Sequence, residues 1–250
     1  MNAPTYSYPS GRFIRAACDL LLARRRDLQK DAKACIEYMS AELKVLGREN
    51  IPNRGGCVLT INHFHLPGLG AQWIALAVTA LVPLHIRWAV TGELMCQGKW
   101  YEAIGSKASI VFLNRLAYIY DLIAMPPMPP RPRDVEARAA SVRAILNYVK
   151  HVNDPVLGIS PEGFNSPGGV LTRPASGFGR FALLLSKAGL RFIPVGGYDA
   201  DGTFHIHFGE EYELGIQCDL PAEEKDERAV QIIMGKIACL LPAYLRGEFV

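Results

Sequence analysis

The sequence lacks both a long hydrophobic run and cysteines at the close, regular spacing of metal or disulfide sites. Its longest apolar stretch, residues 69–84, has sixteen residues with Gln72 among them, which is short for a membrane-spanning helix and predicts a buried one. Its six cysteines are scattered and are expected to be reduced core residues of a cytoplasmic protein. No signal peptide is visible, because Arg15 and Asp19 interrupt the early apolar stretch.

The chain also lacks a strong charge of one sign. Its formal net charge is +3, and residues 1–50 alone hold nine Lys or Arg against six Asp or Glu. The remainder is balanced, which argues against a nucleic-acid-binding face on the core. With 250 residues, 50% of them hydrophobic, the chain can form one well-packed domain. We expect an N-terminal amphipathic helical segment over residues 1–50 and an α/β domain over residues 51–250.

Residues 10–46 predict a helix with two unlike faces. The apolar face holds Phe13, Ala17, Leu20, Leu21 and Leu28. The opposite face holds Arg12, Arg15, Asp19, Arg26, Lys30 and Lys33, while Arg24 and Arg25 lie near the apolar side. Two interpretations fit this periodicity equally: a helix packed on its own domain, and a cationic helix on an anionic membrane surface.

Two short apolar stretches end in polar side chains. Residues 156–159 precede Glu162, and residues 58–61 precede Asn62 and His63, so both stretches predict buried strands. Ligands of open α/β sheets are bound beyond the carboxyl ends of the strands. A histidine there is well suited to accept a proton from a hydroxyl near neutral pH. Either stretch alone is an ordinary strand end, but together they predict a shared site.

Strands that alternate with helices predict a mostly parallel sheet with helices on both faces. Further strands are expected at residues 86–90, 108–113 and 203–208, and helices at residues 134–150, 174–187 and 222–246. Arg115 would follow the second of these strands, either as a surface arginine or as a fixed cation for phosphate. Residues 125–133 contain five prolines and predict an extended loop, which could be a rim over a lipid pocket, a connector or a segment that a partner recognises.

Four ordered blocks resemble a known family. Asn62-His63, Arg115, Ser160-Pro161-Glu162-Gly163 and Phe192-Ile193-Pro194-Val195 are similar to the motifs of glycerolipid acyltransferases of the lysophosphatidic acid acyltransferase type. The likeness covers roughly residues 55–215. Two positions depart from the family pattern. Gly68 stands where the family has an aspartate, and Phe164-Asn165 stands where it has Thr-Arg.

The resemblance implies that a fatty acyl group passes directly from acyl-CoA or an acyl carrier protein to a lipid hydroxyl, with no cofactor. It implies an enzyme of phospholipid biosynthesis, peripheral on the inner face of a membrane. By this resemblance His63 is the general base, and Glu162 with Gly163 shapes the acceptor site. The other substrate-binding candidates are Asn62, Phe164, Asn165, Pro194 on the acyl-carrier side, and the cations Arg115, Arg173 and Arg180.

The missing aspartate leaves alternatives open. A carboxylate beside a catalytic imidazole holds its tautomer, and Glu162, Asp121 or His65 could contact His63 in its place. Otherwise the chain binds lipid or acyl-CoA and catalyses weakly. A metal site is a further alternative, because the pairs His63/His65 and His205/His207 each lie on one face of a strand.

Overall fold

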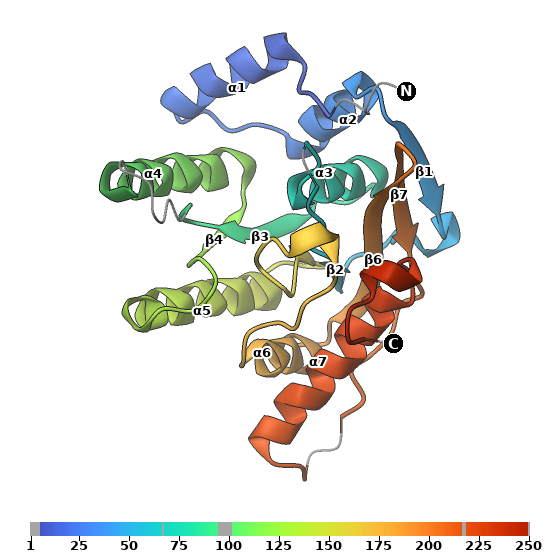
Figure 1. The fold of residues 1–250 in the computed structure, drawn as a ribbon. Helices are drawn as coiled ribbons and strands as arrows, with labels where there is room; N and C mark the ends of the chain where they lie inside the picture. The colour runs from blue at the N-terminus through green and yellow to red at the C-terminus, as the bar shows by residue number, and fades with distance from the viewer. Residues whose placement is uncertain (1–5, 67, 95–101, 217–218, 250) are drawn as a thin grey trace.

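The computed structural model describes residues 6–66, 68–94, 102–216 and 219–249. Its core is a seven-stranded sheet in the order β1-β7-β6-β2-β5-β3-β4 (Figure 1). The strands are β1 Glu42–Leu46, β2 Cys57–Ile61, β3 Arg87–Thr91, β4 Ile123–Met125, β5 Val156–Ile159, β6 Arg191–Ala200 and β7 Thr203–Phe208. Neighbouring strands are parallel except β6 and β7. The prediction of a mostly parallel α/β sheet is confirmed.

Helices cover both faces of the sheet. Figure 1 shows α1 to α4 on one side and α5 to α7 on the other. The helices are α1 Ser10–Leu21, α2 Leu28–Tyr38, α3 Ala71–Leu81, α4 Glu102–Tyr120, α5 Val135–His151, α6 Phe178–Lys187 and α7 Ala222–Ala238. Short 3-10 turns are η1 Arg48–Asn50, η2 Pro132–Asp134, η3 Pro167–Gly169 and η4 Ala243–Leu245. Among the described helices, none has the length and hydropathy needed to cross a membrane.

Strand β2 lies at the centre of the sheet and is buried on both faces. All five of its residues are buried, which explains why it is a continuous apolar run rather than an alternating one. Its neighbours are β6 on one side and β5 on the other, both parallel to it. The carboxyl ends of β2, β5, β6, β3 and β4 therefore lie along one edge of the sheet.

Three elements differ from the sequence prediction. The expected helix over residues 10–46 is two helices followed by strand β1, which pairs with β7. Residues 108–113 are not a strand but the middle of α4, whose inner side buries Leu113, Ala117 and Tyr120 at helical spacing. The last helix ends at Ala238 and is followed by Pro242, which cannot continue it.

The cysteine prediction is only partly right. Cys35 and Cys57 are buried thiols, but Cys18 and Cys239 are exposed, and all four are free. Cys96 and Cys218 lie outside the described residues.

Candidate functional site

His63 and Glu162 meet at the carboxyl edge of the sheet. Strands β2 and β5 run in parallel, with Thr60 opposite Ile159, so the segments that leave them start side by side. The main-chain N–H of His63 donates a hydrogen bond to Oε2 of Glu162 at 2.5 Å. The structure thus brings together two groups that are 99 residues apart in the chain.

Glu162 is a buried carboxyl group held by main-chain donors. Its side chain is 1% exposed, and its Oε1 accepts hydrogen bonds from the main-chain N–H of Thr172 at 2.9 Å and from its hydroxyl at 3.3 Å. Burial raises the pKa of Glu162 to about 7, against the opposing effect of these hydrogen bonds. The carboxyl group therefore joins the loop after β2 to the loop after β5. Thr172, which lies ten residues beyond Glu162, could not be predicted from any sequence pattern.

The imidazole of His63 has a free ring nitrogen. Its Nδ1 is buried and has no hydrogen-bond partner among the described residues. Burial lowers the pKa of His63 and the neighbouring His65 lowers it further, although its own backbone acts in the opposite direction. The ring is therefore neutral near pH 7, as a general base must be.

Three residues were candidates to contact the His63 imidazole in place of the missing aspartate, and they lie in different surroundings. Glu162 contacts His63 through the main chain, and His65 acts on it only electrostatically. Asp121 instead makes an ion pair with Arg87 at 3.1 Å and lies 3.3 Å from the ring of His85. In the described parts of the chain, no carboxylate reaches the imidazole of His63.

Asn62 joins two strands. Its amide nitrogen donates to the carbonyl of Gly197 at 2.8 Å, and its amide oxygen accepts from the N–H of Gly197 at 2.7 Å. The side chain is 1% exposed. Both polar ends of Asn62 are thus used to connect the end of β2 to β6, directly before His63.

The loop after Glu162 lies against the proline-rich segment. Gly163 has φ of +70°, and a Cβ placed there would lie 2.8 Å from Cγ of Met128. Only glycine accommodates both that backbone conformation and this approach. Phe164 and Asn165 follow and are exposed. Met128 of the proline-rich segment therefore lies beside Gly163, and its role as a rim over a lipid pocket stays a prediction.

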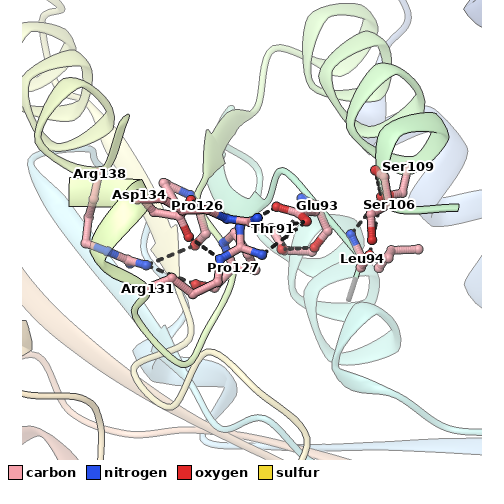
Figure 2. Close-up of polar contacts among 11 residues, drawn as sticks. Thr91, Glu93, Leu94, Ser106, Ser109, Pro126, Pro127, Arg131, Asp134 and Arg138 are labelled. Atoms are coloured by element: carbon pink, nitrogen blue, oxygen red, sulfur yellow. Dashed lines mark hydrogen bonds and ion pairs between the residues drawn. The ribbon is translucent and has the colours of Figure 1, made fainter. Parts of the chain in front are cut away.

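Arginines hold the proline-rich segment in place (Figure 2). Arg138 of α5 donates to the carbonyl of Pro127 at 2.9 Å and lies 3.5 Å from the sulfur of Met128. Arg131 pairs with Asp134 and with Glu93, which follows β3. Hydrogen bonding to Arg131 is the main reason that the pKa of Glu93 lies below its ordinary value. Neither Arg131 nor Glu93 was expected from the sequence to matter.

The three candidate phosphate-binding cations lie in different places. Arg115 is an exposed residue of α4, and its Nη1 donates to the carbonyls of Leu20 and Leu21 at 3.5 and 3.2 Å. Arg173 is paired with Glu227 at 2.5 Å and with Glu248 at 3.0 Å. Arg180 is exposed at the start of α6, and its guanidinium has no ion pair within the described ranges.

Pro194 is buried inside β6 rather than at its end. Its carbonyl accepts from the N–H of Gly209 at 2.9 Å, and a Cβ on Gly209 would lie 2.8 Å from its ring.

A polar cavity of about 270 Å³ lies at the opposite edge of the sheet, lined by residues that precede β2 and by Arg191 and Glu211. It does not involve His63 or Glu162.

The two histidine pairs do not converge. Within the described ranges, no three or more His, Cys, Asp or Glu side chains lie together as a metal site would require. His205 stacks on Tyr198 at 4.7 Å, and Nδ1 of His207 lies 3.4 Å from the carbonyl of Leu240. These contacts explain the second pair as part of the packing around β7.

The fold defines a class first: an α/β domain with a mostly parallel sheet that helices flank on both faces. Among solved structures, the chain is similar to the crystal structure of the 1-acyl-sn-glycerophosphate (LPA) acyltransferase, PlsC, from Thermotoga maritima. The TM-score is 0.50 at 15% identity, over 85% of this chain and 78% of that one. No family model and no curated sequence matches. This likeness shows the fold.

Proposed function

We propose that the chain transfers a fatty acyl group from an acyl thioester to a lipid hydroxyl, with His63 as the general base. The observation that carries the proposal is the hydrogen bond between the His63 main chain and buried Glu162 at the carboxyl edge of the sheet. The similarity of the fold to an acyltransferase supports the reaction class. The four ordered sequence blocks support it independently.

The proposed reaction needs one base and no covalent intermediate on the protein. His63 takes the proton of the acceptor hydroxyl, and the hydroxyl oxygen attacks the thioester carbonyl. The carbon–sulfur bond then breaks, and the sulfur leaves with the proton from the imidazolium. The products are an ester and a thiol. The lowered pKa of His63 keeps the ring neutral at the start of each cycle.

The acceptor side is formed in this proposal by Gly163, Phe164 and Asn165. Phe164 is 37% exposed beside the site and favours an apolar part of the acceptor. Asn165 supplies an amide where the related family has a cation. If the acceptor carries a phosphate, we propose Arg180 as the cation that binds it, because its guanidinium has no ion pair within the described ranges. Arg115 and Arg173 are occupied by other contacts.

The donor is proposed to be acyl-CoA or an acyl carrier protein, and the acceptor to lie in a membrane, with the protein peripheral on the cytoplasmic side. Sequence resemblance supports the donor class. The exposed apolar residues of α1 support the membrane contact, because that helix buries none of its side chains.

A second candidate function is lipid or acyl-CoA binding with weak catalysis. The free Nδ1 of His63 favours it, because nothing in the described chain holds the imidazole tautomer. In a serine protease, disturbing the equivalent contact lowers the rate about ten-thousand-fold.

One assay separates the two functions. Purified protein is offered acyl-CoA and acyl carrier protein donors with a panel of lipid acceptors, and His63→Ala is measured beside it. We expect turnover that falls by roughly a hundredfold or more in His63→Ala, because a general base contributes about that much. Turnover that survives the substitution would contradict the role of His63. Donor binding without turnover for any pair would favour the second function.

A further inference from the structure

Residues 245–249 pack against the loop that leads from β5 to α6. The main-chain N–H of Leu171 donates to the carbonyl of Leu245 at 2.8 Å, and in Figure 1 this red end of the chain lies beside the yellow loop. Gly247 has φ of +59°, and a Cβ placed there would lie 2.3 Å from the carbonyl oxygen of Leu171. Leu245 and Phe249 are buried, so the segment is anchored at both of its ends.

Arg173 is held by the same segment. Its Nε and Nη2 donate to the carboxylate of Glu248 at 3.0 and 3.3 Å, and its Nη1 donates to Glu227 of α7 at 2.5 Å. Each ion pair is partly exposed and contributes little to the free energy of unfolding by itself. Two carboxylates that bind different nitrogens of one planar guanidinium nevertheless fix its orientation. Arg173 is thus attached both to α7 and to the 245–249 segment.

Thr172 lies between these two attachment points. Its main-chain N–H and its hydroxyl donate to Oε1 of Glu162 at 2.9 and 3.3 Å. The other carboxyl oxygen, Oε2, accepts from the main-chain N–H of His63. Since an N–H···O hydrogen bond spans about 2.7–3.2 Å, a shift of the Thr172 main chain by about 1 Å would break its contact with Glu162. The position of Glu162 therefore depends on what holds the main chain around Thr172.

We propose that residues 245–249 are a positioning element of the candidate site. They hold the main chain on both sides of Thr172 and so keep its two donors on Glu162. Glu162 in turn holds the main chain of His63. Arg173 acts in this proposal as a positioning residue and not as a ligand of a substrate phosphate. The effect on turnover rests on the proposed acyl transfer, whereas the coupling of the segment to Glu162 does not.

Gly247→Ala tests the segment in the full chain. The added methyl group cannot stay 2.3 Å from the carbonyl oxygen of Leu171, so the segment and the loop must separate. We expect kcat to fall by roughly tenfold or more, because small displacements of reacting groups have effects of that size. KM should not change, since a rise in KM at constant kcat is the sign of lost substrate binding.

Gly189→Ala is the matched control. Gly189 has φ of +86°, so alanine meets similar backbone strain there, but nothing lies within 4 Å of the added carbon. It precedes β6, which is parallel to β2, and therefore lies at the edge of the sheet opposite to His63. Gly189→Ala should leave kcat unchanged. Thermal unfolding of both variants shows how much stability the backbone strain alone removes.

The protonation of Glu162 gives a second measurement that needs no turnover. The hydrogen bonds from Thr172 lower the pKa of Glu162, while burial raises it to about 7. Releasing Thr172 should therefore raise this pKa further. NMR titration of protein with labelled glutamate side chains measures it, and Glu162→Gln assigns the signal. We expect a raised pKa of Glu162 in Gly247→Ala and the native pKa in Gly189→Ala.

The double substitution Glu227→Gln and Glu248→Gln tests Arg173 without changing a glycine. Both glutamates are exposed, so the variant should fold. The amides form no ion pair, and Arg173 loses both of its fixed partners. If Arg173 positions the loop, kcat falls and KM for lysophosphatidic acid, used as a phosphate-bearing acceptor, stays the same. A phosphate ligand would be freed by the same change, and KM for this acceptor would fall.

Two results would overturn the proposal. One is a native kcat together with a native pKa of Glu162 in Gly247→Ala. The other is a lower KM for lysophosphatidic acid at unchanged kcat in the double glutamine variant. If the native chain has no turnover but the pKa of Glu162 rises in Gly247→Ala, acyl transfer is contradicted and the positioning of Glu162 is supported. Without turnover and without that rise, both proposals fail.

Discussion

Among single residues, Glu162 has the most consequential environment. A carboxyl group that is 1% exposed is costly to ionise, and two main-chain N–H groups recover only part of that cost. Because one of those donors belongs to His63, the protonation of Glu162 changes the support for the proposed base. A proton on Glu162 weakens the hydrogen bond that holds the main chain of His63.

This environment predicts a pH-dependent stability. Between pH 4.5 and about 7, the folded chain binds a proton at Glu162 that the unfolded chain does not bind. The contribution of Glu162 to the free energy of unfolding is therefore fully present below pH 4.5. It is lost as pH rises toward 7, by up to about 3 kcal/mol. Urea unfolding of the native chain and of Glu162→Gln across this range is the measurement. The free energy of unfolding of Glu162→Gln should not fall with pH in this way. Parallel curves of unfolding free energy against pH for the two proteins would contradict the assignment of the effect to Glu162.

The sequence allowed some site residues to be predicted and not others. His63 and Glu162 follow apolar runs that could only be buried strands, so their common edge was predictable. Thr172 was not, because its shorter hydrogen bond to Glu162 comes from a main-chain N–H, which every residue but proline carries. Arg115 was placed wrongly, since its position depended on a strand that does not exist.

Strand β5, which carries Glu162, depends on a glycine. A Cβ on Gly158 would lie 2.2 Å from the ring of Trp88, the residue opposite it on β3. The ring is not free to move, because its N–H donates to the hydroxyl of Thr79 at 2.9 Å. A larger side chain at Gly158 must therefore separate β5 from β3.

Gly158→Ala should lower the free energy of unfolding by about 3 kcal/mol, since the core has no room for the added methyl group. Gly235→Ala is the matched control: it lies inside α7 with nothing within 4 Å of the added carbon. It should raise stability by roughly 0.5–1 kcal/mol, because alanine favours a helix. Thermal unfolding of both variants is the measurement. Equal effects would show that Trp88 moves aside.

Helix α4 shows where local sequence preference fails. The β-branched and aromatic residues of 110–112 favour a strand when considered alone. The longer helical spacing of Leu113, Ala117 and Tyr120 prevails because these side chains are buried between α4 and its neighbours. A pattern over 19 residues thus overrides a local preference over three.

For the whole molecule, an arginine with a largely covered side chain connects three helical segments. Arg26 has a side-chain exposure of 9% and pairs with Asp19 of α1 and Asp31 of α2. It also donates to the hydroxyl of Tyr120 at the end of α4, at 3.0 Å. Since α1 buries none of its own residues, these polar contacts hold it to the rest of the chain.

Arg26→Gln should release α1. Asp19 would lose its counter-ion and Asp31 would keep only Arg12, and the loss of a partner for a partly buried carboxylate typically costs several kcal/mol. Limited trypsin digestion with mass spectrometry should show cleavage after Arg15 and Arg24 that is faster by roughly tenfold or more, while the fragment with the sheet persists. Arg143→Gln, an exposed arginine of α5, is the control. Unchanged cleavage in Arg26→Gln would mean that other contacts hold α1.

The class of the whole fold was predictable, because strand and helix patterns alternate along most of the chain. The position of residues 42–46 in the sheet was not predictable. Those residues form edge strand β1 through pairing with β7, which lies about 160 residues further on. No local pattern reports a partner at that distance.

The parallel pairing of β2 with β5 and β6 has a consequence for synthesis. A chain leaving the ribosome delivers β2 first, yet both of its neighbours are translated about a hundred residues later or more. Until then its apolar residues have no sheet to join, and they are exposed to chaperones and to other nascent chains. The proposed site is therefore completed late in translation, since Thr172 must emerge before Glu162 has all its donors.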